Sequence, residues 1–311
     1  MAYDEERPVM IWLDAIEFKQ YGGWKKDTQF THLMGSAYLL ACEIPGKPVE
    51  NAKTTVDIPQ DGRYRLWIRA KNWYAPYAPG KFTVAVDGKQ SETVLGALPS
   101  RRWTWQIADD YYLEKGEHRL ELVDLTGYMG RCSSVLLTTD MDYLPQNEVA
   151  AFEKERARLK NLPAEPTNGG SYDVIVAGGG PGGTASAILA ARGGAKTLLL
   201  QDRPILGGNA STEAGIGYNG ASSQQFNARE GGIVEEIIRR KTNGQMSWTQ
   251  TLTQMCEEEP NLTVICNQRV RFVDTENLQI RSLTACHTET GSRTTFYGKM
   301  FLDCNGDSEL A

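Results

Sequence analysis

The chain has 311 residues, a length that fits two domains of ordinary size better than one. It is 41% hydrophobic and 23% charged, as globular proteins are. A membrane-spanning helix needs about 18 consecutive apolar residues, and the chain contains no such run, so we expect no membrane contact. The net charge is −6 and the lysines and arginines are spread along the chain, which argues against nucleic acid as a partner.

The N-terminus, "MAYDEERPVM", is acidic and polar where a secretory signal needs a positive start and an apolar run. We therefore expect a cytoplasmic protein. The six cysteines form no CxxC pair, which favours reduced thiols. The three histidines do not stand at metal-ligand spacing from other ligand types, so no metal site is expected.

Short stretches of alternating polar and apolar residues follow one another up to about residue 143. Examples are residues 62–70 ("GRYRLWIRA"), 81–89 ("KFTVAVDGK") and 118–125 ("HRLELVDL"). In the first, Tyr64, Leu66, Ile68 and Ala70 alternate with arginines and Trp67, so one face can be buried while the other stays in water. Half-apolar sheets of this kind bury their faces against each other, and the pattern predicts an all-β sandwich, jelly-roll-like in character, over residues 1–144.

Six of the seven tryptophans lie in the first third of the chain. Large aromatics supply much of the buried surface of a small sandwich, so we expect the following to pack in its interior or at its rim: Trp12, Trp67, Trp103 and Trp105. Trp73, Tyr74 and Tyr77 belong to a proline-rich loop, and we interpret them as candidates for a ligand or domain contact.

Residues 147–160 have the pattern of a charged helix, and residues 161–170 ("NLPAEPTNGG") interrupt it with prolines and glycines. We interpret residues 145–170 as a helical linker between two domains. Residues 171–311 then form a second domain, whose features are of the α/β class.

The second domain opens with a dinucleotide-binding pattern. An apolar strand at residues 173–177 is followed by glycines 178, 180 and 183, a small-residue helix and a second apolar strand at 196–200. In such a unit the first glycine allows a tight turn, the second lets the backbone approach a pyrophosphate, and the third lets helix and strand pack closely. Candidate binding residues are Gly178, Gly180, Pro181, Gly182 and Gly183. Pro181 suits the first helical position, and the helix N-terminus favours an anion.

The acidic residue that usually holds the ribose is absent at its expected position, which is occupied by Gln201 and followed by Asp202 and Arg203. Gln201 can still accept a hydrogen bond from a hydroxyl group. Arg203 could hold the additional phosphate of NADP, although Asp202 beside it opposes that charge. These residues alone leave FAD, NAD and NADP open.

Residues 201–215 ("QDRPILGGNASTEAG") go beyond a general nucleotide fold. They resemble a segment of an FAD-dependent oxidoreductase family within the glutathione-reductase-like flavoproteins. The resemblance implies an α/β Rossmann-like FAD-binding domain, a parallel sheet with a β-meander, in which this second glycine-rich element meets the pyrophosphate and ribityl groups. The FAD contacts that it implies here are Gly207, Gly208, Asn209, Ala210 and Ser211.

The resemblance continues to residue 311. Residues 261–274 resemble the third parallel strand, with Val270 where the backbone meets the adenine, and residues 278–301 resemble the β-meander. The last segment, "FLDCNGDSELA", resembles the final flavin-contacting turn, with Asn305 in place of a threonine, and implies Gly306 and Asp307 as ribityl or pyrophosphate neighbours. The N-terminal region resembles the sandwich that precedes such domains, itself similar to carbohydrate-binding modules.

The sequence thus predicts an FAD-dependent oxidoreductase acting on a small molecule, with a carbohydrate or glycoside as the class suggested by the sandwich. No catalytic residue is assigned. Glu213 and Tyr218 follow the flavin-contacting segment and could be considered, but Glu213 can equally be a carboxylate in a helix or turn, and Tyr218 can equally be an aromatic residue that serves packing. Two alternatives stay open, an NADP-binding reductase and a non-catalytic carbohydrate-binding or interaction fragment. Because the substrate domain of such flavoproteins would follow residue 311, we expect a C-terminally truncated chain.

Overall fold

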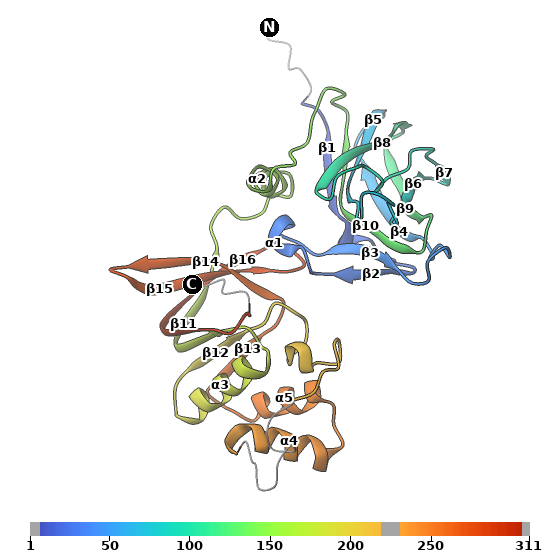
Figure 1. Ribbon diagram of the computed structural model, residues 1–311. Helices are drawn as coiled ribbons and strands as arrows, with labels where there is room; N and C mark the ends of the chain where they lie inside the picture. Colours follow the sequence, from blue (N-terminus) through green and yellow to red (C-terminus); the bar gives the residue numbers. More distant parts are fainter. Residues whose placement is uncertain (1–6, 219–230, 307–311) are drawn as a thin grey trace. The chain divides into compact units, whose positions relative to one another are not determined.

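The computed structural model describes residues 7–218 and 231–306, and the chain divides into two compact units, Met1–Ala164 and Glu165–Ala311 (Figure 1). The boundary falls within the segment expected to be a linker. Each unit is described by itself. None of the helices in the described ranges combines the length and the apolar character that a membrane crossing requires.

The first unit consists of two antiparallel sheets. One sheet has the order β2-β3-β10-β5-β8, with β1 paired to the second half of β10; the other has the order β4-β9-β6-β7. The strands of the first are β1 (Met10–Asp14), β2 (Trp24–Asp27), β3 (Tyr38–Cys42), β5 (Gly62–Lys71), β8 (Trp103–Leu113) and β10 (Tyr128–Thr138). Those of the second are β4 (Ala52–Ile58), β6 (Phe82–Val86), β7 (Lys89–Gln90) and β9 (Gly116–Asp124).

Two hydrophobic clusters stabilise this unit, one on each face of the larger sheet. Between the sheets, alternate residues of β5 such as Leu66 and Ile68 pack with Val84 of β6 and Leu122 of β9. On the opposite face lie the aromatic residues expected to pack, together with Phe152: Trp12, Trp67, Trp103 and Trp105. The larger sheet is therefore covered on both faces along part of its area.

A helix provides this second cover. In addition to η1 (Ala15–Glu17) and α1 (Thr31–Met34), the first unit contains α2 (Val149–Leu159), whose Phe152 is fully buried 5.3 Å from the Trp12 ring. The helix that reads as a charged linker in the sequence thus packs into the first unit. The face of β5 that we expected to be exposed to solvent is therefore partly buried: Trp67 and Arg69 are only 7% and 1% exposed.

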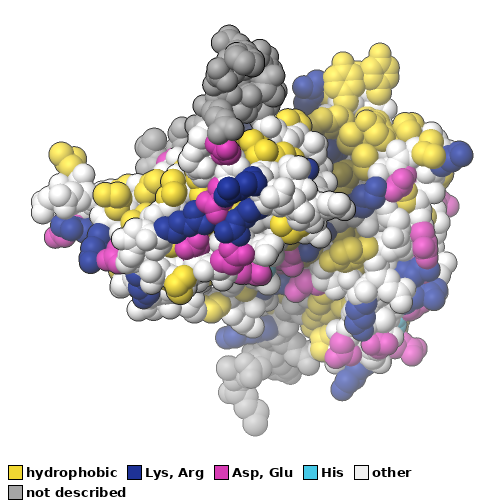
Figure 2. All heavy atoms as spheres, turned by 90° about the horizontal axis from the view of Figure 1, so that it is seen from below, with side chains coloured by type: hydrophobic (Ala, Val, Ile, Leu, Met, Phe, Trp, Pro, Cys, Tyr) yellow, Lys and Arg dark blue, Asp and Glu magenta, His cyan; other side chains and the backbone are white. Residues whose placement is uncertain are grey.

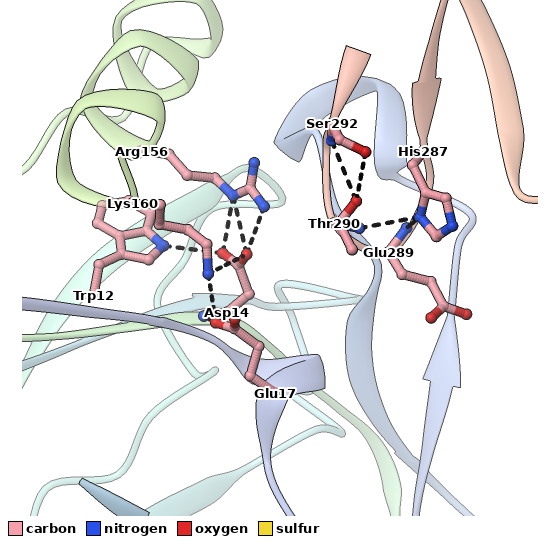
Figure 3. Close-up of polar contacts among 9 residues, drawn as sticks. All are labelled: Trp12, Asp14, Glu17, Arg156, Lys160, His287, Glu289, Thr290 and Ser292. Carbon is pink, nitrogen blue, oxygen red and sulfur yellow. Dashed lines mark hydrogen bonds and ion pairs between the residues drawn. The ribbon is translucent and has the colours of Figure 1, made fainter. Parts of the chain in front are cut away.

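A buried ionic cluster fixes α2 to the strand β1 (Figure 3). The Asp14 carboxylate accepts from Arg156 Nε at 2.9 Å and Nη2 at 2.5 Å, and from the Trp12 indole Nε1 at 2.9 Å. Lys160 Nζ lies 3.2 Å from Asp14 and 2.6 Å from Glu17. Because removal of one partner would leave a buried charge, this cluster constrains where α2 can lie.

The second unit has one six-stranded sheet in the order β13-β12-β11-β16-β15-β14. Its first four strands run parallel to one another, while β16, β15 and β14 pair antiparallel. The strands are β11 (Thr167–Ala177), β12 (Thr197–Leu200), β13 (Leu262–Ile265), β14 (Gln268–Glu276), β15 (Gln279–His287) and β16 (Arg293–Asp303). The helices are α3 (Pro181–Arg192), η2 (Gly208–Ala210), α4 (Gly232–Gly244) and α5 (Trp248–Glu257).

Helices α3, α4 and α5 cover one face of this sheet, where Ile188, Ile237 and Leu252 pack on Val176 and Leu199. Ion pairs join the same helices: Arg192 bridges Glu236 and Glu259, each at 2.6 Å, and Arg240 reaches Glu236 at 3.0 Å and also Glu258. Figure 2 shows basic and acidic side chains interleaved on the face that carries α4 and α5.

The expected third parallel strand is shorter than the sequence indicated. The parallel strand β13 ends at Ile265, Asn267 takes a left-handed conformation (φ 58°), and β14 then begins at Gln268 as part of the antiparallel meander. Asparagine tolerates this conformation better than other non-glycine residues, so a single residue turns the chain. The apolar pattern of residues 261–274 continues across the turn and conceals it.

Candidate cofactor site

The glycine-rich loop lies at the carboxyl ends of the parallel strands β11 and β12. Gly178 has a φ of 108°, and its N–H donates to the Leu200 carbonyl at 2.8 Å. The neighbouring turn after β16 closes on the same place, because Cys304 N–H donates to Ala177 O at 2.7 Å. In open α/β sheets, ligands bind beyond this edge.

Four of the five glycines of the loop divide into two kinds. A Cβ on Gly183 would lie 1.8 Å from the Gly178 carbonyl oxygen, and one on Gly178 would lie 2.4 Å from the Cys304 oxygen. A Cβ on Gly180 or Gly182 would meet nothing within 4 Å. Gly178 and Gly183 therefore permit close packing of strand, helix and final turn, while Gly180 and Gly182 border open space.

That open space faces the N-terminus of α3. Gly180 is the N-cap residue, Pro181 follows at the first helical position, and no side chain caps the helix. The helix begins with Thr184 N–H donating to Gly180 O at 2.9 Å. The N–H groups of the first turn have no acceptor within a helix, and the helix dipole adds a partial positive charge. This arrangement suits an anion such as a pyrophosphate.

The second glycine-rich element packs against the first. Gly207 N–H donates to Gly179 O at 2.8 Å, and a Cβ on Gly208 would lie 3.2 Å from the Gly180 Cα. Both residues have positive φ, 114° and 52°, which glycine adopts without strain. Ala210 and Ser211 are buried, with Ser211 Oγ accepting from Glu213 N–H at 3.2 Å, and Asn209 is exposed. The two elements thus form one continuous backbone surface.

Gln201 connects these elements internally. Its side chain is 3% exposed; Oε1 accepts from Gly179 N–H at 2.7 Å, and Nε2 donates to Ile205 O at 3.1 Å. The amide expected to meet a ribose hydroxyl therefore also holds both glycine elements in position. Asp202 follows it, half-buried, at the end of the strand.

Arg203, the candidate for an NADP phosphate, is engaged elsewhere. Its Nη1 lies 3.3 Å from Glu213 Oε2 in a partly exposed ion pair. A second phosphate on the ribose would have to compete with this carboxylate. The geometry at Arg203 thus gives NADP no specific support.

The remaining implied contacts lie on β14 and after β16. Val270 is 3% exposed in β14, paired with Ala285 of β15. Gly306 has a φ of 83° and open space at its Cβ position, in the turn that packs on Gly178. Asp307 lies outside the described residues.

Buried polar atoms without partners test whether a dinucleotide fits here. In the described part of the chain, Asn305 Nδ2, Asn267 Oδ1 and Gln268 Oε1 are buried without a hydrogen-bond partner. Asn305 adjoins Gly178 of the first glycine element, and Gln268 N–H donates to the carbonyl of Gln201, the residue that connects the two elements, at 2.8 Å. A cofactor with ribityl, phosphate and adenine groups offers acceptors and donors to such atoms. The residues therefore fit FAD.

These three side chains were not assigned as contacts from the sequence. Asn305 was noticed only as a replacement for threonine, and Asn267 and Gln268 lie inside a stretch read as a strand. The signal that could have identified them is their position directly after parallel strands, where side chains reach the ligand edge of the sheet.

Glu213 and Tyr218 both contact neighbouring side chains, and the Tyr218 hydroxyl is buried without a hydrogen-bond partner among the described residues. Glu213 pairs with Arg203, while the Tyr218 ring packs 4.9 Å from that of Trp248. Burial raises the pKa of Tyr218 to about 12, so its hydroxyl would stay protonated near neutral pH. No catalytic residue is assigned within the described ranges.

The second unit matches a known family. Residues 173–311 match the family described as FAD dependent oxidoreductase, and this match indicates FAD as the cofactor of the second unit. The fumarate reductase (cytochrome) of Shewanella frigidimarina is 38% identical over 84 residues, covering 27% of this chain and 14% of that protein. The NADH:fumarate oxidoreductase of Klebsiella pneumoniae (strain 342) is 27% identical over 164 residues, covering 48% and 17%. The chain thus spans less than a fifth of these curated relatives.

Two solved structures align with parts of the chain. A family 35 carbohydrate binding module from Clostridium thermocellum aligns with 41% of this chain and 97% of its own length, at 15% identity and a TM-score of 0.34. A myxobacterial chondrochloren halogenase, described as a variant of FAD-dependent halogenases, covers 44% of this chain and 38% of its own, at 15% identity and a TM-score of 0.33.

Proposed function

We propose that this chain carries the FAD-binding part of an oxidoreductase acting on a small molecule, with a Rossmann-like site for the cofactor at the edge of its parallel strands. The observation that carries the proposal is the open space at Gly180 and Gly182, in front of the uncapped N-terminus of α3. A side chain at either glycine would occupy the space that a pyrophosphate needs.

In this proposal each element has a separate task. The N–H groups at the start of α3 bind the pyrophosphate, and the second glycine element, Gly207 to Ser211, extends the binding surface toward the ribityl chain. Gln201 holds the two elements together, while Asp202 offers a carboxylate to the ribose. Val270 and Gln268 border the adenine, and Asn305, Gly306 and Asp307 border the ribityl or pyrophosphate groups. FAD supplies the electron-transfer chemistry, and the chain binds and orients it.

The substrate class is part of the proposal as well. The aromatic loop of the first unit supports a carbohydrate or glycoside: Trp73, Tyr74 and Tyr77 are 39%, 41% and 77% exposed, and the two tyrosine rings stack 5.4 Å apart. Exposed aromatic faces can pack on sugar rings.

Cofactor binding can be tested with the purified chain. We expect it to retain a yellow cofactor, or to take up added FAD with quenching of flavin fluorescence, and to bind FAD more tightly than NAD or NADP. A colourless protein that takes up no FAD would contradict the proposal, and preferential NADP binding would favour the reductase alternative.

A further inference from the structure

A second candidate site lies within the first unit, far in sequence from the glycine loops. It is a cavity of about 610 Å³ between the larger sheet, α1 and the start of α2. Side chains from β5, the β8 region and the N-terminal end of α2 line it, among them Arg69, Lys71, Arg101, Arg102, Trp103 and Glu148. Four of these six carry positive charge.

Arg69 is unusual among them because it is buried and two of its nitrogen atoms have no hydrogen-bond partner among the described residues. The residue is 1% exposed, and its Nε and Nη1 have no hydrogen-bond partner within the described ranges. Its guanidinium lies 3.8 Å from the centre of the Phe152 ring, an interaction that leaves the in-plane N–H groups free. Burial lowers the pKa of Arg69 to about 9. Buried charges are normally paired, so these donors of Arg69 are available to an anion.

The carboxylate that acts on Arg69, Glu155, is already engaged. Glu155 contributes a favourable charge to Arg69, yet it accepts hydrogen bonds from the Tyr143 hydroxyl and from Gln146 N–H, the latter at 3.0 Å. It therefore serves the segment before α2, and the N–H groups of Arg69 stay unsatisfied.

A second unsatisfied donor lines the same cavity. The Trp103 indole Nε1 is buried without a partner in the described structure, and the ring centre lies 5.9 Å from Arg69 Cζ. Both groups can only donate hydrogen bonds. An occupant with closely spaced acceptor oxygens would satisfy them together.

The charge of the wall agrees with such an occupant. Burial, Arg131 and Arg101 lower the pKa of Lys71, as expected where cations crowd together. The lining carboxylate of Glu148 accepts from Ala151 N–H at 2.9 Å as the N-cap of α2, and these backbone hydrogen bonds lower its pKa. The Glu148 carboxylate therefore binds the N–H groups at the start of α2.

We propose that this cavity is a binding site for a small oxyanion-bearing molecule, whose carboxylate or phosphate oxygens accept from Arg69 and Trp103 Nε1. Lys71, Arg101 and Arg102 add charge around the entrance. This proposal does not depend on the proposed FAD site, which belongs to the second unit.

Calorimetric titration of the full chain with inorganic phosphate and with citrate tests the proposal, with sodium chloride at equal ionic strength as the baseline. We expect saturable binding of at least one of the two, phosphate indicating a phosphate ester as ligand and citrate a carboxylate. Arg69→Met should weaken it about tenfold or more, as expected for loss of a buried charged hydrogen bond. The same substitution should leave the free protein at least as stable, because it removes an unpaired buried charge.

Two further variants keep the test decisive. Arg63 lies on the same strand as Arg69, but it is exposed and paired with Asp110 at 2.8 Å. The Arg63→Gln variant should therefore bind the anion as tightly as the wild type does. Arg101→Gln, an exposed lining residue, should weaken binding even if Arg69→Met does not fold. Absence of saturable binding in the wild type, or equal binding by the wild type and every variant, would overturn the proposal.

Discussion

Gly180 and Gly183 stand three residues apart in one turn, yet an added methyl group would meet entirely different surroundings. At Gly183 it would lie 1.8 Å from a backbone oxygen, whereas at Gly180 it would meet nothing within 4 Å. We predict that Gly183→Ala lowers the free energy of unfolding of the second unit by about 1–3 kcal/mol, the usual cost of overpacking. Gly180→Ala should change it by less than about 0.5 kcal/mol. Denaturant unfolding measures both, and equal stabilities would refute the distinction.

Asp14 makes the first unit sensitive to acid. Burial raises the pKa of Asp14, but the charges of Arg156 and Lys160 outweigh it, so the pKa lies below the usual 3.8. The unfolded chain then takes up a proton at higher pH than the folded chain. The ionised carboxylate therefore contributes stability above about pH 3.8, and this contribution is lost as the pH falls below that value.

The matching prediction concerns Asp14→Asn. It should cost about 3–5 kcal/mol near pH 6, because Arg156 and Lys160 lose the buried carboxylate that both of them contact. The difference from the wild type should narrow as the pH falls below about 3.8. Urea unfolding over this pH range measures it, with the exposed Asp57→Asn as a control. A difference that is independent of pH would show that the carboxylate charge is not the source.

Side chains also show what the sequence could not reveal. The glycine fingerprint was readable because it reflects local backbone geometry, and the structure places those glycines at the end of β11. The hydrogen bonds of Gln201 and the burial of Arg69 could not be predicted from the sequence. The hydrogen bonds of Gln201 go to Gly179 and Ile205, and Arg69 becomes buried only because α2 covers it. Both depend on partners that are distant along the chain or on a neighbouring element.

At the scale of elements, Phe152 provides the aromatic contact that holds α2 against the larger sheet, in addition to the ionic cluster at Asp14. This side chain is fully buried and packs on the rings of Trp12 and Trp105 at 5.3 and 6.3 Å. Phe152→Ala should therefore cost about 3–5 kcal/mol, the range for a buried aromatic. Lys154→Ala, on the exposed side of the same helix, should be nearly neutral. Thermal unfolding distinguishes them, and a neutral Phe152→Ala would mean that α2 does not stabilise the sandwich.

Element types were easier to predict from sequence than their partners. The β-rich character of the first third followed from alternation, and the helix after Pro181 followed from its start signals. The packing of α2 was missed because its charged residues suggested an exposed helix, although Glu155 and Arg156 are 7% and 3% exposed. The end of β13 was missed because one asparagine with positive φ interrupts an otherwise continuous pattern.

At the scale of the whole molecule, two compact units carry two different proposed ligands. We predict two calorimetric unfolding transitions, because each unit has its own hydrophobic clusters. FAD should raise the midpoint of one transition, and phosphate or citrate that of the other, since each ligand stabilises only the unit that binds it. A single transition raised by either ligand would show that the units unfold together.

The most direct test of the central claim is FAD binding by Gly180→Val. Its backbone angles (φ −71°, ψ −176°) suit a side chain, and the valine would occupy the space before α3 without disturbing the free protein. We predict that fluorescence titration shows FAD binding by the wild type and by Leu189→Ala, a control at a half-exposed position of α3. Gly180→Val should show wild-type stability and no measurable binding. If Gly180→Val binds FAD as tightly as the wild type, the cofactor does not lie on this loop.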